Sequence, residues 1–260
     1  MLKVLAVIPA RFRSTRLAGK PLALIQGKPM VSLVYENTLA TELFDDVVVA
    51  TDDEAIRDVI AGAGGRAVMT KPDHPSGTDR VAEVAKDSHA DIVVNIQGDL
   101  PFVSHALLAP LIGTMVSELS VPMATIAVPI RDREQWTNPN VVKVVTDEQG
   151  FALYFSRAPI PARRDPDPEG MANVELGLQH VGVYGYRRDF LLRFTSWTPS
   201  ALERIERLEQ LRALERGVKI FVARVSEVVV EVDTAEDLAR ANQIAAADPR
   251  HGQMERVGDP

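Results

Sequence analysis

The sequence contains no cysteine, no long apolar run and no acidic residue among its first twenty positions. The lack of cysteine excludes disulfide bonds, thiolate zinc sites and a cysteine nucleophile, and it favours a cytoplasmic location. Apolar runs such as 4–10 and 121–130 are shorter than the ~20 residues that a membrane-spanning helix needs, so no membrane partner is expected. The chain starts with one Lys and a β-rich run without an Ala-x-Ala cleavage site, which predicts no secretory leader.

The charge of the chain is unevenly distributed. The net charge of −7 argues against general nucleic-acid binding, so no nucleic-acid partner is expected. The first twenty residues nevertheless hold five cations, namely Lys3, Arg11, Arg13, Arg16 and Lys20. A concentrated basic segment in an acidic protein indicates a small anionic substrate.

Short runs of branched apolar residues alternate with helical patterns through the first half of the 260 residues. Strands are expected at 2–8, 47–50, 66–69, 91–96 and 123–128, and helices at 29–41, 54–62, 79–86 and 105–118. This alternation indicates an α/β fold with a doubly wound, mostly parallel sheet and right-handed crossovers.

From Arg131 onward the alternation changes. The expected elements are a hairpin of 141–146 and 151–156, a surface loop over 159–173, a strand over 179–186, a helix from Ser200 to about 215, strands over 218–225 and 228–232, and a last helix capped by Thr234. We therefore expect a single domain over 1–247, which includes a lobe at about 131–190, followed by a frayed tail over 248–260.

The basic segment 9–21 reads Pro-Ala-Arg-Phe-Arg-Ser-Thr-Arg-Leu-Ala-Gly-Lys-Pro. It leaves the carboxyl end of the first expected strand, where open α/β sheets bind ligands. It lacks the Gly-x-Gly of a dinucleotide site, and it is not a Walker P-loop because proline follows Gly19-Lys20. Four cations within ten residues suit the polyphosphate of a nucleoside triphosphate. The alternative is a solvated basic loop.

Two carboxylates follow expected strands. Asp99 ends the run Asn-Ile-Gln-Gly-Asp, where the neighbouring Gly98 permits close backbone approach, and Asp233 precedes Thr234. Each has an ordinary alternative, a loop aspartate or local helix capping. As a pair they suit Mg²⁺, which usually takes only one or two protein carboxylates beside a triphosphate.

Three further groups are candidates for binding. The segment 74–80 is expected to start a helix, whose free amides suit an anion or a base carbonyl. His180 lies on an expected strand, and Glu209 and Gln210 lie on an expected amphipathic helix. A structural histidine and a solvated helix face are the alternatives.

The basic segment resembles the motif Pro-Ala-Arg-x-x-Ser-Thr-Arg-Leu-x-Gly-Lys-Pro of the 3-deoxy-manno-octulosonate (Kdo) cytidylyltransferases, or CMP-Kdo synthetases. Other segments resemble this family in the same order, namely 50–52, 76–80, 95–99, 152–157, 180–186, 208–212 and 232–234. The resemblance covers nearly the whole chain, from Leu2 to about Ala247.

This resemblance implies a nucleotide-diphospho-sugar transferase fold with an inserted hairpin lobe that forms a homodimer around Tyr154 and Arg157. It implies transfer of CMP from CTP to Kdo, with Mg²⁺, for lipopolysaccharide synthesis. The implied catalytic residues are Arg11, Lys20, Asp99 and Asp233, the last two as metal ligands. The implied substrate-binding residues are Ala10, Arg16, Ser76, Gly77, Arg80, Gln97, Arg157, His180, Tyr184, Glu209 and Gln210. Arg11 and Lys20 would hold the triphosphate with Arg16 nearby, and Ser76 and Gly77 would border the cytosine. The residues that would line the sugar pocket are Arg80, Gln97, His180, Tyr184, Glu209 and Gln210.

The chain departs from the family pattern at a few positions. Leu100 stands where glutamate is common, 229–231 is Val-Val-Glu instead of part of Pro-x-x-Gly, and Ala235 replaces a usual proline. A related group that acts on 8-amino-Kdo also varies at these places. An alternative sugar is therefore 8-amino-Kdo or a sialic-acid-like acid, and an alternative class is a non-catalytic nucleotide sensor.

Overall fold

The computed structural model describes residues 2–12, 17–162, 164 and 174–247. Its strands are β1 (Val4–Ala10), β2 (Leu24–Ile25), β3 (Lys28–Pro29), β4 (Asp46–Thr51), β5 (Ala67–Met69), β6 (Ile92–Asn95), β7 (Met123–Ile130), β8 (Lys143–Thr146), β9 (Ala152–Ser156), β10 (Gly177–Arg187) and β11 (Ile220–Arg224). Its helices are η1 (Lys20–Leu22), α1 (Met30–Leu39), α2 (Glu54–Gly62), α3 (Gly77–Lys86), α4 (His105–Ser117), α5 (Arg133–Thr137), α6 (Arg188–Thr195), α7 (Ala201–Glu206), α8 (Leu211–Leu214) and α9 (Ala235–Ala247).

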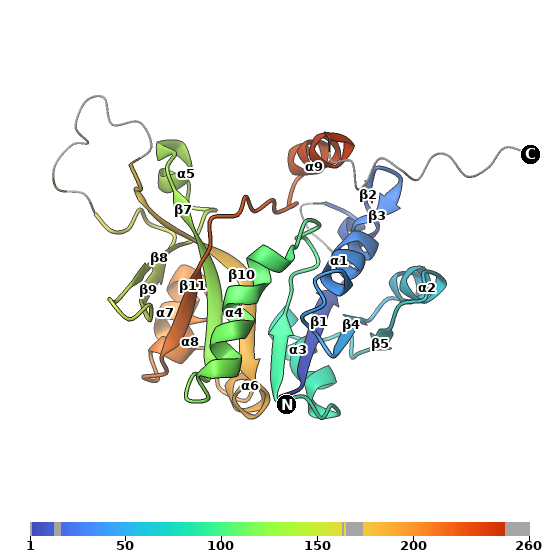
Figure 1. The fold of residues 1–260 in the computed structure, drawn as a ribbon, viewed down its shortest axis with the longest axis horizontal. Coiled ribbons are helices and arrows are strands. Elements are labelled where there is room, and N and C mark those ends of the chain that lie inside the picture. The colour runs from blue at the N-terminus through green and yellow to red at the C-terminus, as the bar shows by residue number, and fades with distance from the viewer. Residues whose placement is uncertain (1, 13–16, 163, 165–173, 248–260) are drawn as a thin grey trace, which may run out of the picture.

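The main sheet has the strand order β11-β7-β10-β6-β1-β4-β5, and the hairpin of β8 and β9 joins it through β10 (Figure 1). Strands β6, β1, β4 and β5 pair in parallel, as do β11 and β7. Strand β10 runs antiparallel to both β6 and β7. The predicted α/β class with a mostly parallel sheet is therefore confirmed.

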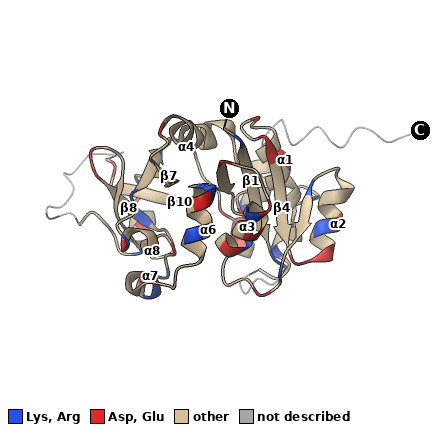
Figure 2. Cartoon of the chain, turned by 90° about the horizontal axis from the view of Figure 1, so that it is seen from below, with Lys and Arg blue, Asp and Glu red and all other residues tan. Residues whose placement is uncertain are grey.

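Helices cover both faces of the sheet, which is why its central strands are apolar on both sides. Along β1, Ala6 and Ile8 pack toward α1, α2 and α4, whereas Leu5 and Val7 pack toward α3 and α6. On α3 and α6, acidic and basic side chains are intermingled instead of forming one basic face (Figure 2). Within the described residues, no helix combines the length and the apolar character that crossing a membrane requires.

Most predicted elements are found within a few residues of their expected bounds. The helix at 54–62 and the hairpin of 141–146 and 151–156 are confirmed. The predicted caps are also present, since Ser76 Oγ accepts from the Asp79 amide at 3.1 Å and Thr234 Oγ1 accepts from the Asp237 amide at 3.2 Å. The loop over 159–173 and the tail over 248–260 lie largely outside the described residues.

Two predicted elements are wrong. The helix expected from Ser200 to about 215 is broken into α7 and α8, because Arg207 takes a left-handed backbone conformation with φ 54°. Residues 228–232 form no strand. The Val232 amide donates instead to the Asp99 carbonyl at 3.0 Å, and Val230 and Val232 pack among residues of α1 and α9. Helices α5 and α6 were not predicted.

Candidate active site

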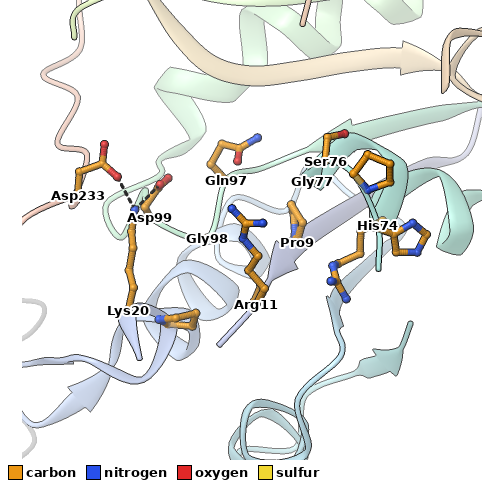
Figure 3. A pocket seen from close by; sticks show the side chains of 14 residues that line it. Pro9, Arg11, Lys20, His74, Ser76, Gly77, Gln97, Gly98, Asp99 and Asp233 are labelled. Carbon is orange, nitrogen blue, oxygen red and sulfur yellow. Dashed lines mark hydrogen bonds and ion pairs between the residues drawn. The ribbon is translucent and has the colours of Figure 1, made fainter. Parts of the chain in front are cut away.

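The candidate residues gather beyond the carboxyl ends of β1, β4 and β6. A pocket of about 280 Å³ opens there, between the loop after β1, the loop after β6 and the start of α3 (Figure 3). The predicted residues that line it are Ala10, Arg11, Lys20, Ser76, Gly77, Arg80, Gln97, Asp99 and Asp233. This is the edge of an open α/β sheet where ligands bind.

Gly98 allows the loop after β6 to pass directly against the end of β1. A Cβ atom at this position would lie 3.1 Å from the Pro9 carbonyl oxygen and 4.0 Å from the Cβ atom of Ala10. A side chain here would push the loop away from the strand. The glycine thereby holds Asp99 at the pocket.

Lys20 connects the two predicted metal carboxylates. Its Nζ donates to Asp99 Oδ2 and to Asp233 Oδ1, both at 2.7 Å (Figure 3). Burial lowers the pKa of the Lys20 ammonium, but the two aspartates outweigh this and raise the pKa overall. The prediction that Asp99 and Asp233 converge is therefore confirmed.

The donor set around Lys20 consists of oxygens that suit Mg²⁺. Carboxylate oxygens are the ligands that a hard cation prefers, and two of them already contact one cationic group. Within the described residues, no group of three or more His, Cys, Asp or Glu side chains is placed to hold a metal ion. The two aspartates fit Mg²⁺ if a bound triphosphate supplies further oxygens.

Glu231 adds a third carboxyl group near this pair. Burial and the nearby charges of Asp99 and Asp233 together raise the pKa of Glu231 to about 7. The side chain still has substantial contact with solvent at the mouth of a groove, so the aspartate charges are the firmer cause of the raised pKa. Sequence reasoning missed this residue because it was expected on a strand.

The start of α3 forms the side of the pocket opposite Lys20. Ser76 Oγ lies 3.1 Å from Glu209 Oε1, and Thr78 Oγ1 donates to Glu209 Oε2 at 2.6 Å. Arg80 is buried, and its guanidinium lies 3.2 Å from Asp52 Oδ1. The structure therefore places Arg80 in this pocket and not among the other residues predicted to contact the sugar.

The two cations of the basic segment that the structure describes both belong to the pocket. Arg11 and Lys20 approach it from the loop after β1 (Figure 3). Arg16 lies outside the described residues. The pocket thus combines cations with free space, as a polyphosphate site requires.

A second, larger groove of about 970 Å³ adjoins the pocket. Gln97 and Asp233 line both spaces, so the carboxylate pair stands at their junction. The other predicted residues that line the groove are Arg157, His180, Tyr184, Glu209 and Gln210.

His180 is a neutral hydrogen-bonding group in this groove. Burial lowers the pKa of its imidazole to about 3. Its Nε2 lies 3.0 Å from Thr125 Oγ1, and the ring meets that of Phe155 edge-on at 5.2 Å between centroids. Tyr184 lies beside it, and burial raises the pKa of this phenol, which therefore stays protonated.

Gln210 has a polar atom without a described partner, whereas Arg157 is hydrogen-bonded to the backbone. Gln210 is buried, and its Nε2 has no hydrogen-bond partner among the described residues, so a ligand oxygen would satisfy this donor. The Arg157 guanidinium donates to the carbonyl oxygens of Glu206 at 2.8 Å and Pro139 at 3.0 Å.

Sequence reasoning also missed Lys143, a fully buried lysine at the start of β8. Its Nζ donates to three carbonyl oxygens, those of Asn138 at 2.9 Å, Val141 at 2.6 Å and Arg157 at 2.7 Å. This ammonium fastens the segment 138–141 to Arg157, which follows β9, and Asn138, Val141 and Arg157 all line the groove. The sequence signal that could have identified it is its position between two pairs of valines.

Comparisons with known proteins agree on one family. A family model described as cytidylyltransferase matches residues 5–220. A protein of Syntrophotalea carbinolica named 3-deoxy-manno-octulosonate cytidylyltransferase is 48% identical over 242 residues, which cover 92% of this chain and 97% of the relative. A protein of Vibrio vulnificus with the same name is 48% identical over 248 residues, which cover 93% and 97%.

Solved structures give the same result. The chain is similar to a CMP:2-keto-3-deoxy-manno-octonic acid synthetase in complex with CTP, with a TM-score of 0.86 and 40% identity over 94% of this chain and 98% of that chain. It also matches a putative glucose-1-phosphate thymidylyltransferase of Bacillus anthracis at a TM-score of 0.66 and 15% identity, over 94% and 96% of the two chains, which shows a shared fold.

Proposed function

The chain belongs to the 3-deoxy-manno-octulosonate cytidylyltransferase family, and we propose that it transfers CMP from CTP to Kdo, giving CMP-Kdo and pyrophosphate. The observation that carries this proposal is the convergence of Lys20, Asp99 and Asp233 at the junction of a small pocket and a larger groove. The nucleotide would occupy the pocket and the sugar the groove, so that the reacting atoms meet beside the carboxylates.

The pocket provides for each part of CTP. Arg11 and Lys20 supply cations for the triphosphate, and Ala10 lies at the end of β1 where the chain turns toward them. Ser76 and Gly77 begin α3, whose free amides suit a base carbonyl or an anion. Arg16 is proposed to lie near the triphosphate on the resemblance alone.

We propose Mg²⁺ as the cofactor, held by Asp99 and Asp233 together with substrate oxygens. When bound, it would supply positive charge to the α-phosphate and lower the pKa of the sugar hydroxyl. Lys20 contacts both carboxylates, so it would turn toward the triphosphate when the divalent ion arrives. Lys20 would thus pair with the two carboxylates before the metal ion binds and with the triphosphate afterwards.

The groove provides polar groups for a sugar acid. His180 and Tyr184 are both neutral, and they suit hydroxyl groups. Gln210 offers a buried amide donor that lacks a described partner, and Glu209 is oriented by Thr78. Gln97 lies at the junction, where the anomeric hydroxyl would meet the α-phosphate.

The reaction that follows is an in-line displacement. The anomeric hydroxyl oxygen attacks the α-phosphorus of CTP and gives up its proton to water, the bond from phosphorus to the bridging oxygen breaks, and pyrophosphate leaves with the electron pair. Positioning and charge stabilisation dominate such transfers. Lys20 and Arg11 line the pocket and would offset the negative charge on the leaving pyrophosphate.

A homodimer, a cytoplasmic location and a part in lipopolysaccharide synthesis are proposed by the same resemblance. The hairpin of β8 and β9 would form the dimer contact, and its Leu153 is 63% exposed.

Pyrophosphate release with CTP and a panel of acidic sugars tests the proposal. Kdo is expected to be the best acceptor, ahead of 8-amino-Kdo and a sialic acid. Asp99→Ala and Asp233→Ala are expected to fold normally and to lose turnover by orders of magnitude, whereas Asp58→Ala on the exposed side of α2 serves as the control. Near-native turnover in either aspartate variant would overturn the carboxylate assignment. Titration with CTP that shows binding, together with no pyrophosphate release, would indicate a nucleotide sensor.

A further inference from the structure

The groove is acidic although its proposed substrate is an acid. Among its described lining residues are six carboxylic acids, namely Asp132, Glu134, Glu209, Glu231, Asp233 and Asp237, and three arginines, namely Arg157, Arg207 and Arg240. A sugar carboxylate that enters such a groove needs a cationic partner, because a charge that leaves water without one is strongly disfavoured. One of the three arginines should therefore recognise it.

Two of the arginines have another partner nearby. Arg157 donates through its Nε and Nη1 atoms to the carbonyl oxygens of Glu206 and Pro139. Arg240 makes no hydrogen bond or ion pair with another described residue, but it shares α9 with Asp237. Burial raises the pKa of the Asp237 carboxyl, whereas its hydrogen bonds and, to a smaller extent, the charge of Arg240 lower it overall. Arg207 is exposed and makes no hydrogen bond or ion pair with another described residue.

The backbone at Arg207 does not require an arginine. Its φ of 54° and ψ of 47° lie in the left-handed region, where glycine is the favoured residue and a larger side chain is strained. This turn ends α7 and precedes Leu208, Glu209 and Gln210, which all line the groove. A strained, charged residue at a groove suggests a role in binding more than in folding.

We propose that the Arg207 guanidinium binds the carboxylate of the sugar acid and so sets the preference for an acidic acceptor. The inference rests on the proposed function, because the carboxylate belongs to the acceptor named there. It assigns Arg207 to the sugar, whereas Arg11 and Lys20 serve the nucleotide.

The test compares Arg207→Gly with Arg207→Gln and with the parent. Both variants are expected to raise the KM for Kdo about tenfold to a hundredfold, the effect of one lost charge-assisted hydrogen bond, and to leave the KM for CTP within about twofold. Because glycine relieves the left-handed strain, Arg207→Gly should melt at the same temperature as the parent or higher. A structural role would instead lower the melting temperature and raise both KM values.

Glu42→Gly is the matched control, since Glu42 is an exposed residue with φ 57° in the turn between α1 and β4. It should match Arg207→Gly in melting behaviour and leave both KM values unchanged. The carboxamide of Kdo, used as acceptor, should remove the difference between the parent and Arg207→Gly.

An unchanged KM for Kdo in Arg207→Gly, with normal turnover in the parent, overturns this inference and leaves the proposed function standing. A persistent difference with the carboxamide overturns it as well. A parent enzyme that releases no pyrophosphate with any acidic sugar overturns the proposed function, and the inference fails with it.

Discussion

Replacing Lys20 with methionine is expected to tighten the binding of a divalent cation while it weakens the binding of CTP. In the structure the Lys20 ammonium contacts Asp99 and Asp233 at 2.7 Å each, so a metal ion must displace it before it can take both carboxylates. Methionine has a similar length and no charge. The variant therefore removes the competitor and keeps the carboxylates.

The size of the effect follows from the geometry. Two unit charges about 4 Å apart interact by about 4 kcal/mol at an effective dielectric constant of about 20. The Lys20, Asp99 and Asp233 side chains are 13%, 28% and 32% exposed, so solvent reduces this interaction, and the displaced ammonium regains water. A net penalty of about 1–3 kcal/mol remains, which corresponds to a dissociation constant for the metal about 10- to 100-fold lower in Lys20→Met.

The assay is a titration with Mn²⁺ in the absence of nucleotide, followed by electron paramagnetic resonance, with a parallel calorimetric titration of CTP. Lys28→Met is the matched control, because Lys28 pairs at 2.6 Å with Glu36, away from the pocket residues. Lys20→Arg should keep the weak metal binding of the parent. If folded Lys20→Met binds Mn²⁺ no more tightly than the parent, the metal does not compete with Lys20 for these carboxylates.

Two further predictions concern buried groups. The folded-state pKa of His180 is lowered from 6.5 to about 3, so the unfolded chain binds the extra proton first, and stability from this group is lost as the pH falls below about 6.5. At about 1.4 kcal/mol per pKa unit, the free energy of unfolding measured in urea should be about 3 kcal/mol lower at pH 4 than at pH 7. The variant His180→Gln should remove this difference. The control His105→Gln, at the exposed start of α4, should retain it. Lys143→Met leaves three carbonyl oxygens without their donor and should lower the free energy of unfolding by about 3 kcal/mol, whereas a loss under about 1 kcal/mol in urea unfolding would show that water replaces the ammonium.

The fold was largely predictable because its signals are local. The runs that form β1 and β4 are apolar on both faces, since helices cover both sides of the sheet, and this pattern is visible in a few consecutive residues. The antiparallel direction of β10 was not predictable from periodicity. It depends on a hairpin returning the chain beside β6, which is a property of the tertiary arrangement.

The broken helix shows why spacing alone can mislead. Apolar residues recur every three positions from Leu202 to Leu214, which is typical of one helix face. In the structure Ile205 is 77% exposed and Leu208 is buried, because the left-handed backbone of Arg207 ends α7 between them. The spacing of the apolar residues therefore predicted one continuous helix, whereas these residues belong to two separate helices and the turn between them.

In the site, too, local sequence features were predictable and contacts between distant residues were not. Asp99 was identifiable because it follows a buried strand and a glycine, whereas the contact between Thr78 and Glu209 joins residues 131 positions apart. Lys20 illustrates the limit of a family resemblance, which assigned it to the triphosphate and gave no reason to place it between two aspartates. The role of a side chain in the absence of ligand is decided by the charges that tertiary packing brings near it.

The convergence of the two aspartates depends on the backbone and not on Lys20. The Val232 amide donates to the Asp99 carbonyl at 3.0 Å, which joins the segment before α9 to the loop after β6. The Asp237 carboxylate accepts from the Asp233 amide at 3.1 Å and so fixes the start of α9. Because these bonds hold the backbones of Asp99 and Asp233 side by side, the loss of the Lys20 charge should leave the pair in place, ready for a divalent cation. A pair assembled only by attraction to Lys20 would separate in Lys20→Met, and the metal affinity would then fall instead of rise.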